Sequence, residues 1–295
     1  MKKRKKFFNT ELLFHLIFIL LCILVLYPFL LIVAISFSNE KDVALEGYKL
    51  IPKHFDLSAY RFVFKNPQSI IDAYKVTTFT TVVGTFLSVI LMAMVAYPLS
   101  KRDMEGRRFI SFYLFFTMLF AGGMVPSYIL ITQYLHLNDT IWVFILPGLI
   151  NVWHVFLLRT FFAGIPVELI ESALLDGASE YRIFFTMILP LSKPVLATVA
   201  LLGALIRWND WFTAMLYIND EKLLTLQYLL QRILMNIQLL QQQGSMSANG
   251  ISVSEMPSET VRMAMAVIAA GPMLLVFPFF QKYFVRGLTV GSVKG

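Results

Sequence analysis

Apolar residues along this chain gather into long runs that are separated by shorter polar stretches. Six runs are long enough to cross a hydrocarbon core of ~30 Å as helices. They cover residues 12–37, 76–99, 109–133, 140–163, 187–207 and 263–281. The pattern therefore predicts an all-α chain with six transmembrane helices, organised as a single polytopic domain over residues 1–295.

Two polar segments are long enough to form loops outside the membrane. Residues 38–73 carry balanced charge, and the aromatic side chains at 57–64 predict a short helix at the membrane interface. Residues 209–260 are net acidic, and apolar residues that recur every three or four positions predict a helix over 223–240. We expect a flexible, hydrogen-bonding tip at 241–250, which begins with Gln241, Gln242, Gln243, Gly244 and Ser245.

The distribution of charge orients the chain. The protein is 58% hydrophobic, with a mean hydropathy of +0.70 and a net charge of +7. The excess cations cluster at 2–6, 101–108 and 282–294, which six helices place on one side of the membrane. Because basic clusters select the cytoplasmic side, both termini are expected there and no nucleic-acid partner is predicted. The basic N-terminal run also fits the start of a signal peptide, but no small-x-small cleavage site follows it.

Residues 165–186 form a polar loop between the fourth and fifth predicted helices. Pro166 suits a first helical position because its missing N–H would be unpaired there. Gly177 is expected to end that helix, and Ser179 to begin a second turn. The segment therefore predicts two short helices joined by a bend, a shape suited to docking on a partner. Its carboxylates are expected to be solvated: Glu168, Glu171, Asp176 and Glu180.

This loop carries a family resemblance. It resembles the EAA loop of the membrane subunits of binding-protein-dependent ABC importers, through Glu171-Ser172-Ala173, then Gly177 after three residues, then Met187-Ile188-Leu189-Pro190 after nine. Ser172 stands where that loop usually has alanine, and Met187 where it has isoleucine. Asp176-Gly177-Ala178 and the segment 279–289 are similar to the carbohydrate-uptake permeases of this family, within them to the MalG-like half and the LplC/YtcP group. The resemblance spans nearly the whole chain.

The resemblance implies the fold of a type I (MetI-like) importer permease, a multi-pass subunit surrounded by lipid in the bacterial plasma membrane. The implied partners are a second homologous permease subunit, two cytoplasmic ATPase subunits and an extracellular solute-binding protein that delivers an oligosaccharide. The implied mechanism is alternating access, in which ATP closes the ATPase dimer and the docked loops move together. The residues that the resemblance assigns to ATPase coupling are Glu171, Ser172, Ala173, Asp176, Gly177, Leu189 and Pro190.

The chain itself shows no signature of a nucleotide or metal site. A P-loop requires a glycine followed by lysine, and no glycine in this sequence is followed by lysine. ATP and Mg²⁺ are therefore expected on the separate ATPase, and no cofactor is expected in this chain. The histidines, His15, His54, His136 and His154, have no second ligand at metal spacing, so no metal site is predicted. No catalytic residue is predicted either.

Two external features have both a functional and a structural interpretation. Trp208, Asn209 and Asp210 resemble a recurrent feature of carbohydrate permeases, which implies an external gate, while the tryptophans also fit an interfacial belt. The tip at 241–250 lies where MalG-like subunits carry a loop that enters the sugar cleft of the binding protein. Its amides suit such a scoop, with a disordered connector as the alternative.

Two other functional classes compete with the importer subunit. An ion-gradient-driven secondary transporter would normally carry charges within its spans, but no charge lies near the middle of a predicted span, and Arg207 lies near a span end. An intramembrane enzyme would need a convergent nucleophile, acid and metal set, which is missing. Pro190 and Pro194 are interpreted either as packing features of a bent bundle or as a hinge next to the docking loop.

Overall fold

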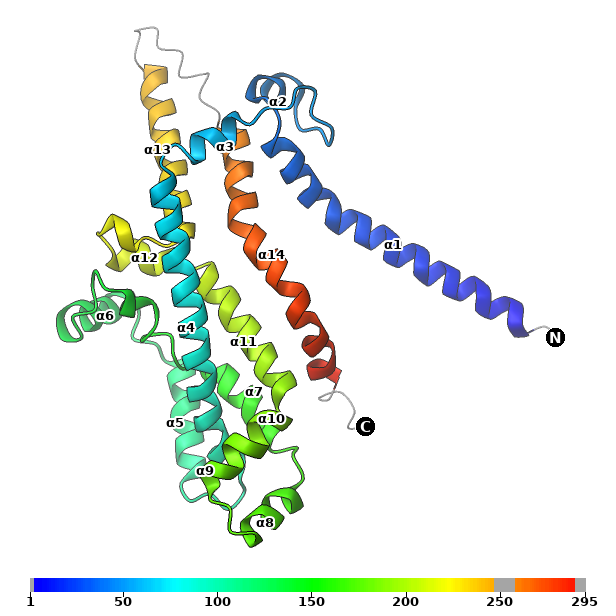
Figure 1. The fold of residues 1–295 in the computed structure, drawn as a ribbon, viewed down its shortest axis with the longest axis vertical. Helices are drawn as coiled ribbons and strands as arrows, with labels where there is room; N and C mark the ends of the chain where they lie inside the picture. Colours follow the sequence, from blue (N-terminus) through cyan, green and yellow to red (C-terminus); the bar gives the residue numbers. More distant parts are fainter. Residues whose placement is uncertain (1–2, 247–257, 290–295) are drawn as a thin grey trace. The chain divides into compact units, whose positions relative to one another are not determined.

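The structure is a computed structural model that describes residues 3–246 and 258–289. These residues are mainly helical, with irregular connections, turns and one isolated bridge between Ser38 and Phe55 (Figure 1). The α-helices are α1 (Lys3–Ser36), α2 (Glu40–Glu46), α3 (Ser58–Val63), α4 (Pro67–Ser100), α5 (Arg107–Leu119), α6 (Met124–Ile129), α7 (Val152–Phe162), α8 (Val167–Leu175), α9 (Glu180–Ile183), α10 (Leu189–Leu191), α11 (Lys193–Trp208), α12 (Phe212–Tyr217), α13 (Leu226–Met246) and α14 (Glu259–Thr289). Short π or 3₁₀ segments are η1 (Leu130–Tyr134), η2 (Ile141–Phe144), η3 (Phe184–Ile188) and η4 (Glu221–Leu223).

The chain divides into two compact units. The first contains the residues up to Pro67 together with Leu230–Gly271, and the second contains Gln68–Leu229 together with the residues from Pro272 onward. Within the first unit, residues 11–30 of α1 are exposed on every side. An apolar helix of this kind is suited to lipid as its solvent.

The loop expected over 38–73 is folded in the first unit. Phe37 stacks on Phe55 and on Tyr60, with ring centroids 5.4 and 5.0 Å apart. Glu40 accepts hydrogen bonds from the amides of Ser258, Glu259 and Thr260 at the start of α14. The short helix predicted at 57–64 is present as α3, but α4 begins at Pro67, inside the predicted loop. Its 34 residues rise ~50 Å, so this helix is longer than the hydrocarbon core requires.

Three helical segments are long and apolar enough to cross a membrane unaided: Glu11–Ser36, Pro67–Ser100 and Glu259–Phe279. Three bent helix pairs pass the same test together, so the number of spans reaches six when each pair counts as one. By length and composition, the helices of the described residues are therefore compatible with the six predicted spans.

The predicted third, fourth and fifth spans are each interrupted in the structure. The run 109–133 splits between α5 and α6 with a bend of 108°, and the run 140–163 contains the irregular segment 145–151 before α7. The run 187–207 bends by 79° at Ser192, between α10 and α11. Glycine or proline stands in the first two breaks, and Pro190 and Pro194 flank the third. Glycine permits unusual φ angles, and proline removes a helical hydrogen bond. Gly123, for example, has a φ of +87°.

The helix predicted over 223–240 is observed as α13, but it continues to Met246 and so includes 241–245, where a flexible tip was expected. Glutamine is a good helix former, and a single glycine costs only ~1 kcal/mol in a helix, so a glutamine tract extends α13 without difficulty. The remainder of the predicted tip, 247–250, lies outside the described residues.

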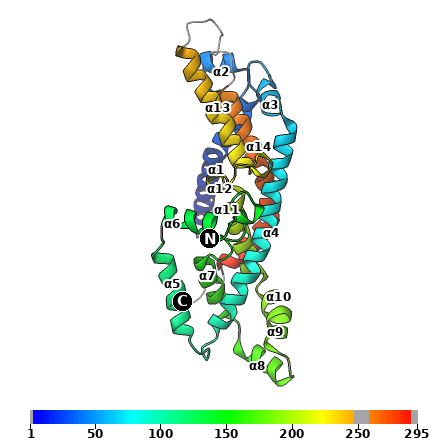
Figure 2. The same cartoon turned by 90° about the vertical axis from the view of Figure 1, so that its left-hand side faces the viewer.

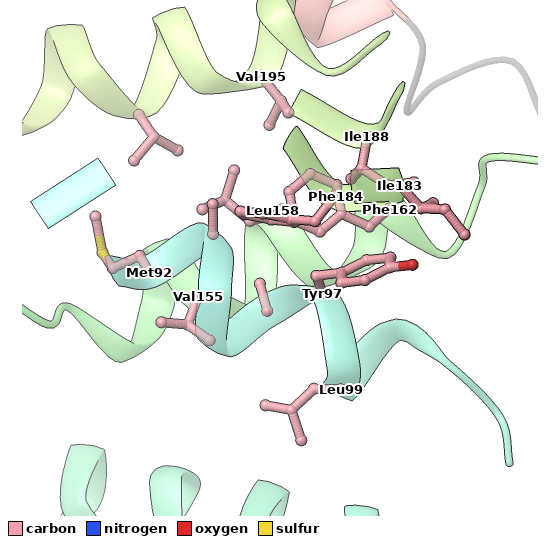
Figure 3. Close-up of a cluster of buried hydrophobic side chains, with 13 residues drawn as sticks. Met92, Tyr97, Leu99, Val155, Leu158, Phe162, Ile183, Phe184, Ile188 and Val195 are labelled. Carbon is pink, nitrogen blue, oxygen red and sulfur yellow. The ribbon is translucent and has the colours of Figure 1, made fainter. Parts of the chain in front are cut away.

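The second unit is held together by a cluster of 13 buried side chains (Figure 3). They come from the end of α4, from α7, from the stretch α9–η3 and from α11. The ring of Tyr97 on α4 lies 5.5 Å from that of Phe184 on η3. In both views of the ribbon, α8 and α9 lie at the end of this unit where α4 leads into α5 (Figures 1 and 2). The cluster thus connects the predicted docking loop to the helices.

Candidate functional site

The predicted docking loop forms two short helices joined at Gly177. Helix α8 begins at Val167, with Pro166 as its N-cap residue rather than its first helical residue. It ends in a Schellman motif, in which the amide of Gly177 donates to Leu174 O and the amide of Ala178 to Ala173 O, both at 3.0 Å. Gly177 has a φ of +79°, so the bend requires the left-handed conformation that glycine adopts without strain. Ser179 then caps α9 by accepting from the amide of Arg182.

The two faces of this elbow, residues 166–181, differ in what they contact. Ile170, Ala173 and Ala178 are half-buried against the core cluster. The opposite face exposes the candidate coupling residues Glu171, Ser172 and Asp176. It also exposes large apolar side chains that the sequence did not single out: Val167, Leu169, Leu174, Leu175 and Tyr181. Leu175 is 89% exposed, and apolar side chains gathered on a polar loop are typical of an interaction surface.

Glu180 is exposed, as expected of a solvated carboxylate, but it also has two partners that the sequence did not suggest. Its Oε2 accepts a hydrogen bond of 2.9 Å from the hydroxyl of Tyr97, and its Oε1 pairs with Lys101. The ammonium of Lys101 also lies 5.0 Å from the centre of the Tyr97 ring. Three side chains therefore join the start of α9 to the end of α4. Sequence spacing gave no signal for this anchor, because its members lie about 80 residues apart.

The remaining coupling candidates, Leu189 and Pro190, lie where the chain turns from the elbow into α11. Leu189 is half-buried against the core cluster, and Pro190 is exposed. The chain bends by 79° at Ser192, directly after α10. The structure thus brings Ala173 and Leu189 to one core cluster and leaves Glu171 and Pro190 at the surface.

The gate candidates lie at the other end of α11. Trp208 is only 5% exposed, and its ring lies 6.4 Å from that of Tyr74, so it is packed within the unit rather than displayed in an interfacial belt. Asn209 donates to Leu205 O and accepts from Gln227. Asp210 accepts from the amide of Thr213 at 3.0 Å. The scoop candidates 241–245 lie in the described helical backbone of α13.

A cavity of about 580 Å³ opens in the second unit. We call it the arginine cavity, because Arg207 on α11 contributes to its wall. Two of the helix breaks also line it, through Gly123 and through Pro147 with Gly148. Within a membrane, irregular backbone is tolerated where it is buried in protein or lines a cavity. The breaks that the apolar runs concealed are therefore explained by the cavity that they shape.

The titratable side chains of the described residues form no group of three or more that could hold a metal ion. His154 is buried in the wall of the arginine cavity, and His54 pairs with Asp42 at 2.8 Å. These placements give each histidine its own surroundings rather than a shared ligand set.

Comparison with known proteins identifies the family. Residues 76–290 match the family described as the binding-protein-dependent transport system inner membrane component. The chain is 43% identical over 282 residues to the polygalacturonan/rhamnogalacturonan transport system permease protein YtcP of Bacillus subtilis (strain 168), which covers 96% of both chains. It is 42% identical to the protein LplC of the same organism, over 91% of this chain and 89% of LplC.

Comparison with a solved structure also supports the fold of an importer permease. The chain matches a crystal structure of a bacterial ABC transporter involved in the import of the acidic polysaccharide alginate, with 31% identity and a TM-score of 0.78 over 96% of this chain and 99% of the other. The protein thus has the all-α membrane fold of an ABC importer permease. It belongs to the binding-protein-dependent transport system inner membrane component family, and its role is that of a transport subunit for sugars rather than an enzyme.

Proposed function

We propose that this permease subunit passes oligosaccharides from an external binding protein to the cytoplasm by alternating access. The proposed oligosaccharides are fragments of plant or algal polysaccharides. The names of the similar proteins support this substrate class, since they refer to polygalacturonan, rhamnogalacturonan and alginate. The subunit pairs with a second, homologous permease, and two ATPase subunits supply ATP hydrolysis and hold Mg²⁺.

The elbow is the surface on which one ATPase docks. The observation that carries this assignment is the positive φ of Gly177, because it turns an exposed face of acidic and apolar side chains outward while the other face stays packed on the core. Glu171 would meet cationic or N–H groups of the ATPase, and Leu175 would fill an apolar part of the docking cleft. Glu180, bonded to Tyr97 and Lys101, would pass the movement of the elbow to α4.

The membrane orientation that we propose is argued from the basic residues at the end of the second unit that carries the elbow. Lys101, the first of the basic residues at 101–108, pairs with Glu180 of the elbow, and basic clusters favour the cytoplasmic side. The loop at 38–73, the segment 209–260 with its scoop, and the gate residues Trp208, Asn209 and Asp210 would then be external. In a Cys22→Ser background, an impermeant thiol reagent should label Lys49→Cys from outside and spare Ser179→Cys. The opposite labelling would refute this orientation.

The elbow assignment is tested by the backbone strain of Gly177→Val. A β-branched residue in the left-handed region costs ~1–3 kcal/mol, although a Cβ at Gly177 has nothing within 4 Å. In proteoliposomes with the whole complex, we expect binding-protein-stimulated transport to fall about 10-fold or more, because the docking geometry is populated less. Gly177→Asn should lose much less, since asparagine tolerates this conformation.

Gly106→Val is the matched control. Gly106 also has a positive φ, +73°, and open space around its Cβ position, but it lies before α5 and outside the elbow. Gly106→Val should introduce the same backbone strain as Gly177→Val without reducing the coupling of ATP hydrolysis to transport. Equal losses of transport in Gly106→Val and Gly177→Val, or full transport in Gly177→Val together with Glu171→Lys, would refute the elbow as the coupling surface.

A further inference from the structure

Arg207 is a partly buried cation whose hydrogen bonds go to backbone carbonyls. Its Nη2 donates to Gly148 O at 2.7 Å, and its Nη1 lies 3.5 Å from Gly203 O. Its Nε is buried and has no hydrogen-bond partner among the described residues. A guanidinium has five N–H donors in a planar fork, so these carbonyl contacts leave several of them unused.

Three glycines from separate elements surround this guanidinium. A Cβ at Gly84 on α4 would lie 2.6 Å from Nε, and one at Gly203 on α11 would lie 3.4 Å from Nη1. A Cβ at Gly148, in the break before α7, would lie 3.8 Å from Nη2. Only the Cβ at Gly84 would be too close, so the side chain occupies a slot that depends on Gly84, while Cβ atoms at Gly203 and Gly148 would make ordinary contacts with it. Such a slot holds the charge in one place at the wall of the arginine cavity.

The cavity around Arg207 has the chemistry of a sugar site. Of the described residues that line it, Arg207 is the only lysine or arginine, and Asp210 is the only carboxylate. Asp210 is already engaged with the amide of Thr213. Thr85, which also lines the cavity, has a buried hydroxyl with no partner among the described residues. Phe144 and Phe212 add apolar ring surface, and pockets that combine such surface with a few fixed polar groups are typical of small-molecule sites.

We propose that Arg207 binds the carboxylate of a uronate unit as an acidic oligosaccharide passes through the arginine cavity. This inference rests on the proposed function and narrows its substrate to sugars that carry carboxylates. Arginine matches a carboxylate with two parallel hydrogen bonds, which are stronger than bonds to neutral groups. Charged residues within membrane segments usually face the bundle interior or a water-filled cavity and mark substrate pathways. A neutral sugar would gain only the weaker bonds.

The test compares one acidic probe with its neutral ester. Uptake of trigalacturonate and of its fully methyl-esterified form would be measured in proteoliposomes containing the whole complex, for the wild type, Arg207→Gln and Arg207→Lys. The quantity of interest is the ratio of the two uptake efficiencies, because the preference of the binding protein is common to all variants and cancels. Arg207→Gln should lower the acid-to-ester ratio roughly 10- to 100-fold, and Arg207→Lys should retain part of it.

Arg159→Gln is the matched control. Arg159 is also partly buried in the second unit, where it lies 3.4 Å from the Ser111 hydroxyl, but it does not line the cavity. Its loss should leave the ratio unchanged. If Arg207→Gln leaves the ratio at the wild-type value, whether or not both rates fall, the arginine serves packing only and the inference is wrong. If the wild type takes up neutral arabinose or galactose oligomers but not trigalacturonate, the inference fails while the proposed function stands. If it takes up no oligosaccharide, both fail.

Discussion

Glu40 in the first unit and Arg207 in the second are both partly buried charges, but their surroundings are opposite. The Glu40 carboxylate accepts from the amides of Ser258, Glu259 and Thr260 at 3.0, 3.0 and 2.9 Å, and from the Thr260 hydroxyl at 2.6 Å. Arg207 has two backbone carbonyls and an Nε without a partner among the described residues. The fold supplies the Glu40 carboxylate with several hydrogen-bond donors, but among the described residues it leaves part of the Arg207 guanidinium without acceptors.

This difference separates a structural charge from one available to a ligand. Glu40 acts as an N-cap supplied from elsewhere in the chain, because the first amides of α14 have no partners within their own helix. Removing it should affect folding and little else. Removing Arg207 deletes donors that the fold leaves unused, so its effect should appear in transport. The following predictions test that contrast, beginning with the largest expected effect.

Glu40→Ala should destabilise the protein by ~2–3 kcal/mol, because it leaves the amides at the start of α14 without their charged acceptor. Thermal unfolding of the purified complex measures the loss, and amide hydrogen exchange at Ser258–Thr260 locates it. Glu105→Ala, at an exposed position, is the control and should change neither. A Glu40→Ala variant that unfolds like the wild type would show that the cap adds nothing to stability.

The same cap predicts a pH dependence that is smaller than the effect of Glu40→Ala. Burial raises the pKa of Glu40, but the hydrogen bonds from Thr260, Glu259 and Ser258 outweigh burial, so the pKa lies below its ordinary value of 4.5. A carboxyl with a lowered folded pKa stabilises fully above the unfolded pKa, and that contribution is lost as pH falls through the folded value. Stability measured from pH 6 down to pH 3 should therefore decline less in Glu40→Gln than in the wild type. Parallel curves for the two proteins would contradict this.

The glycine slot predicts an energetic coupling between Gly84 and Arg207 of ~1–2 kcal/mol. Gly84→Ala should be unfavourable in the wild type, because its Cβ would displace the Arg207 side chain from the slot. In an Arg207→Ala background the same change should be neutral or stabilising, since alanine is the better helix former. A double-mutant cycle by thermal unfolding measures the coupling. Gly271→Ala, where a Cβ meets nothing within 4 Å, should show no such coupling, and an additive Gly84 cycle would rule out the slot.

The sequence predicts this architecture well where single runs of residues decide it. The first apolar run, 12–37, coincides with α1 up to the end of that helix at Ser36, because one unbroken run of apolar residues decides it. The elbow was also predictable, because Gly177 is the one glycine within 165–186 and its bend depends on local backbone preference. The Schellman hydrogen bonds follow from that preference alone.

The features that the sequence did not reveal arise from contacts between distant segments. In the sequence, Arg207 is an arginine near the end of a span. The structure shows that Gly84, Gly148 and Gly203 lie around its side chain. Glu180 is an exposed carboxylate of the elbow, and its contacts with Tyr97 on α4 and with Lys101 just after α4 cannot be read from the sequence. The breaks at Gly122-Gly123 and Pro147-Gly148 did have a local signal, because both are helix-disrupting pairs, but counting apolar residues concealed them.

Thr85→Val should have the smallest effect on stability. Replacing a buried hydroxyl that has no partner by an isosteric methyl group removes a desolvation penalty, so unfolding should be unchanged or the protein stabilised by up to ~1 kcal/mol. Thr81→Val is the matched control, because its hydroxyl is also buried and unpartnered among the described residues but does not line the arginine cavity. Both variants should unfold alike, and only Thr85→Val should slow oligosaccharide uptake, since Thr85 lines the cavity of the proposed sugar path. Equal uptake by the two variants would place Thr85 outside that path, and a clear loss of stability in Thr85→Val would mean that its hydroxyl is already bonded in the folded protein.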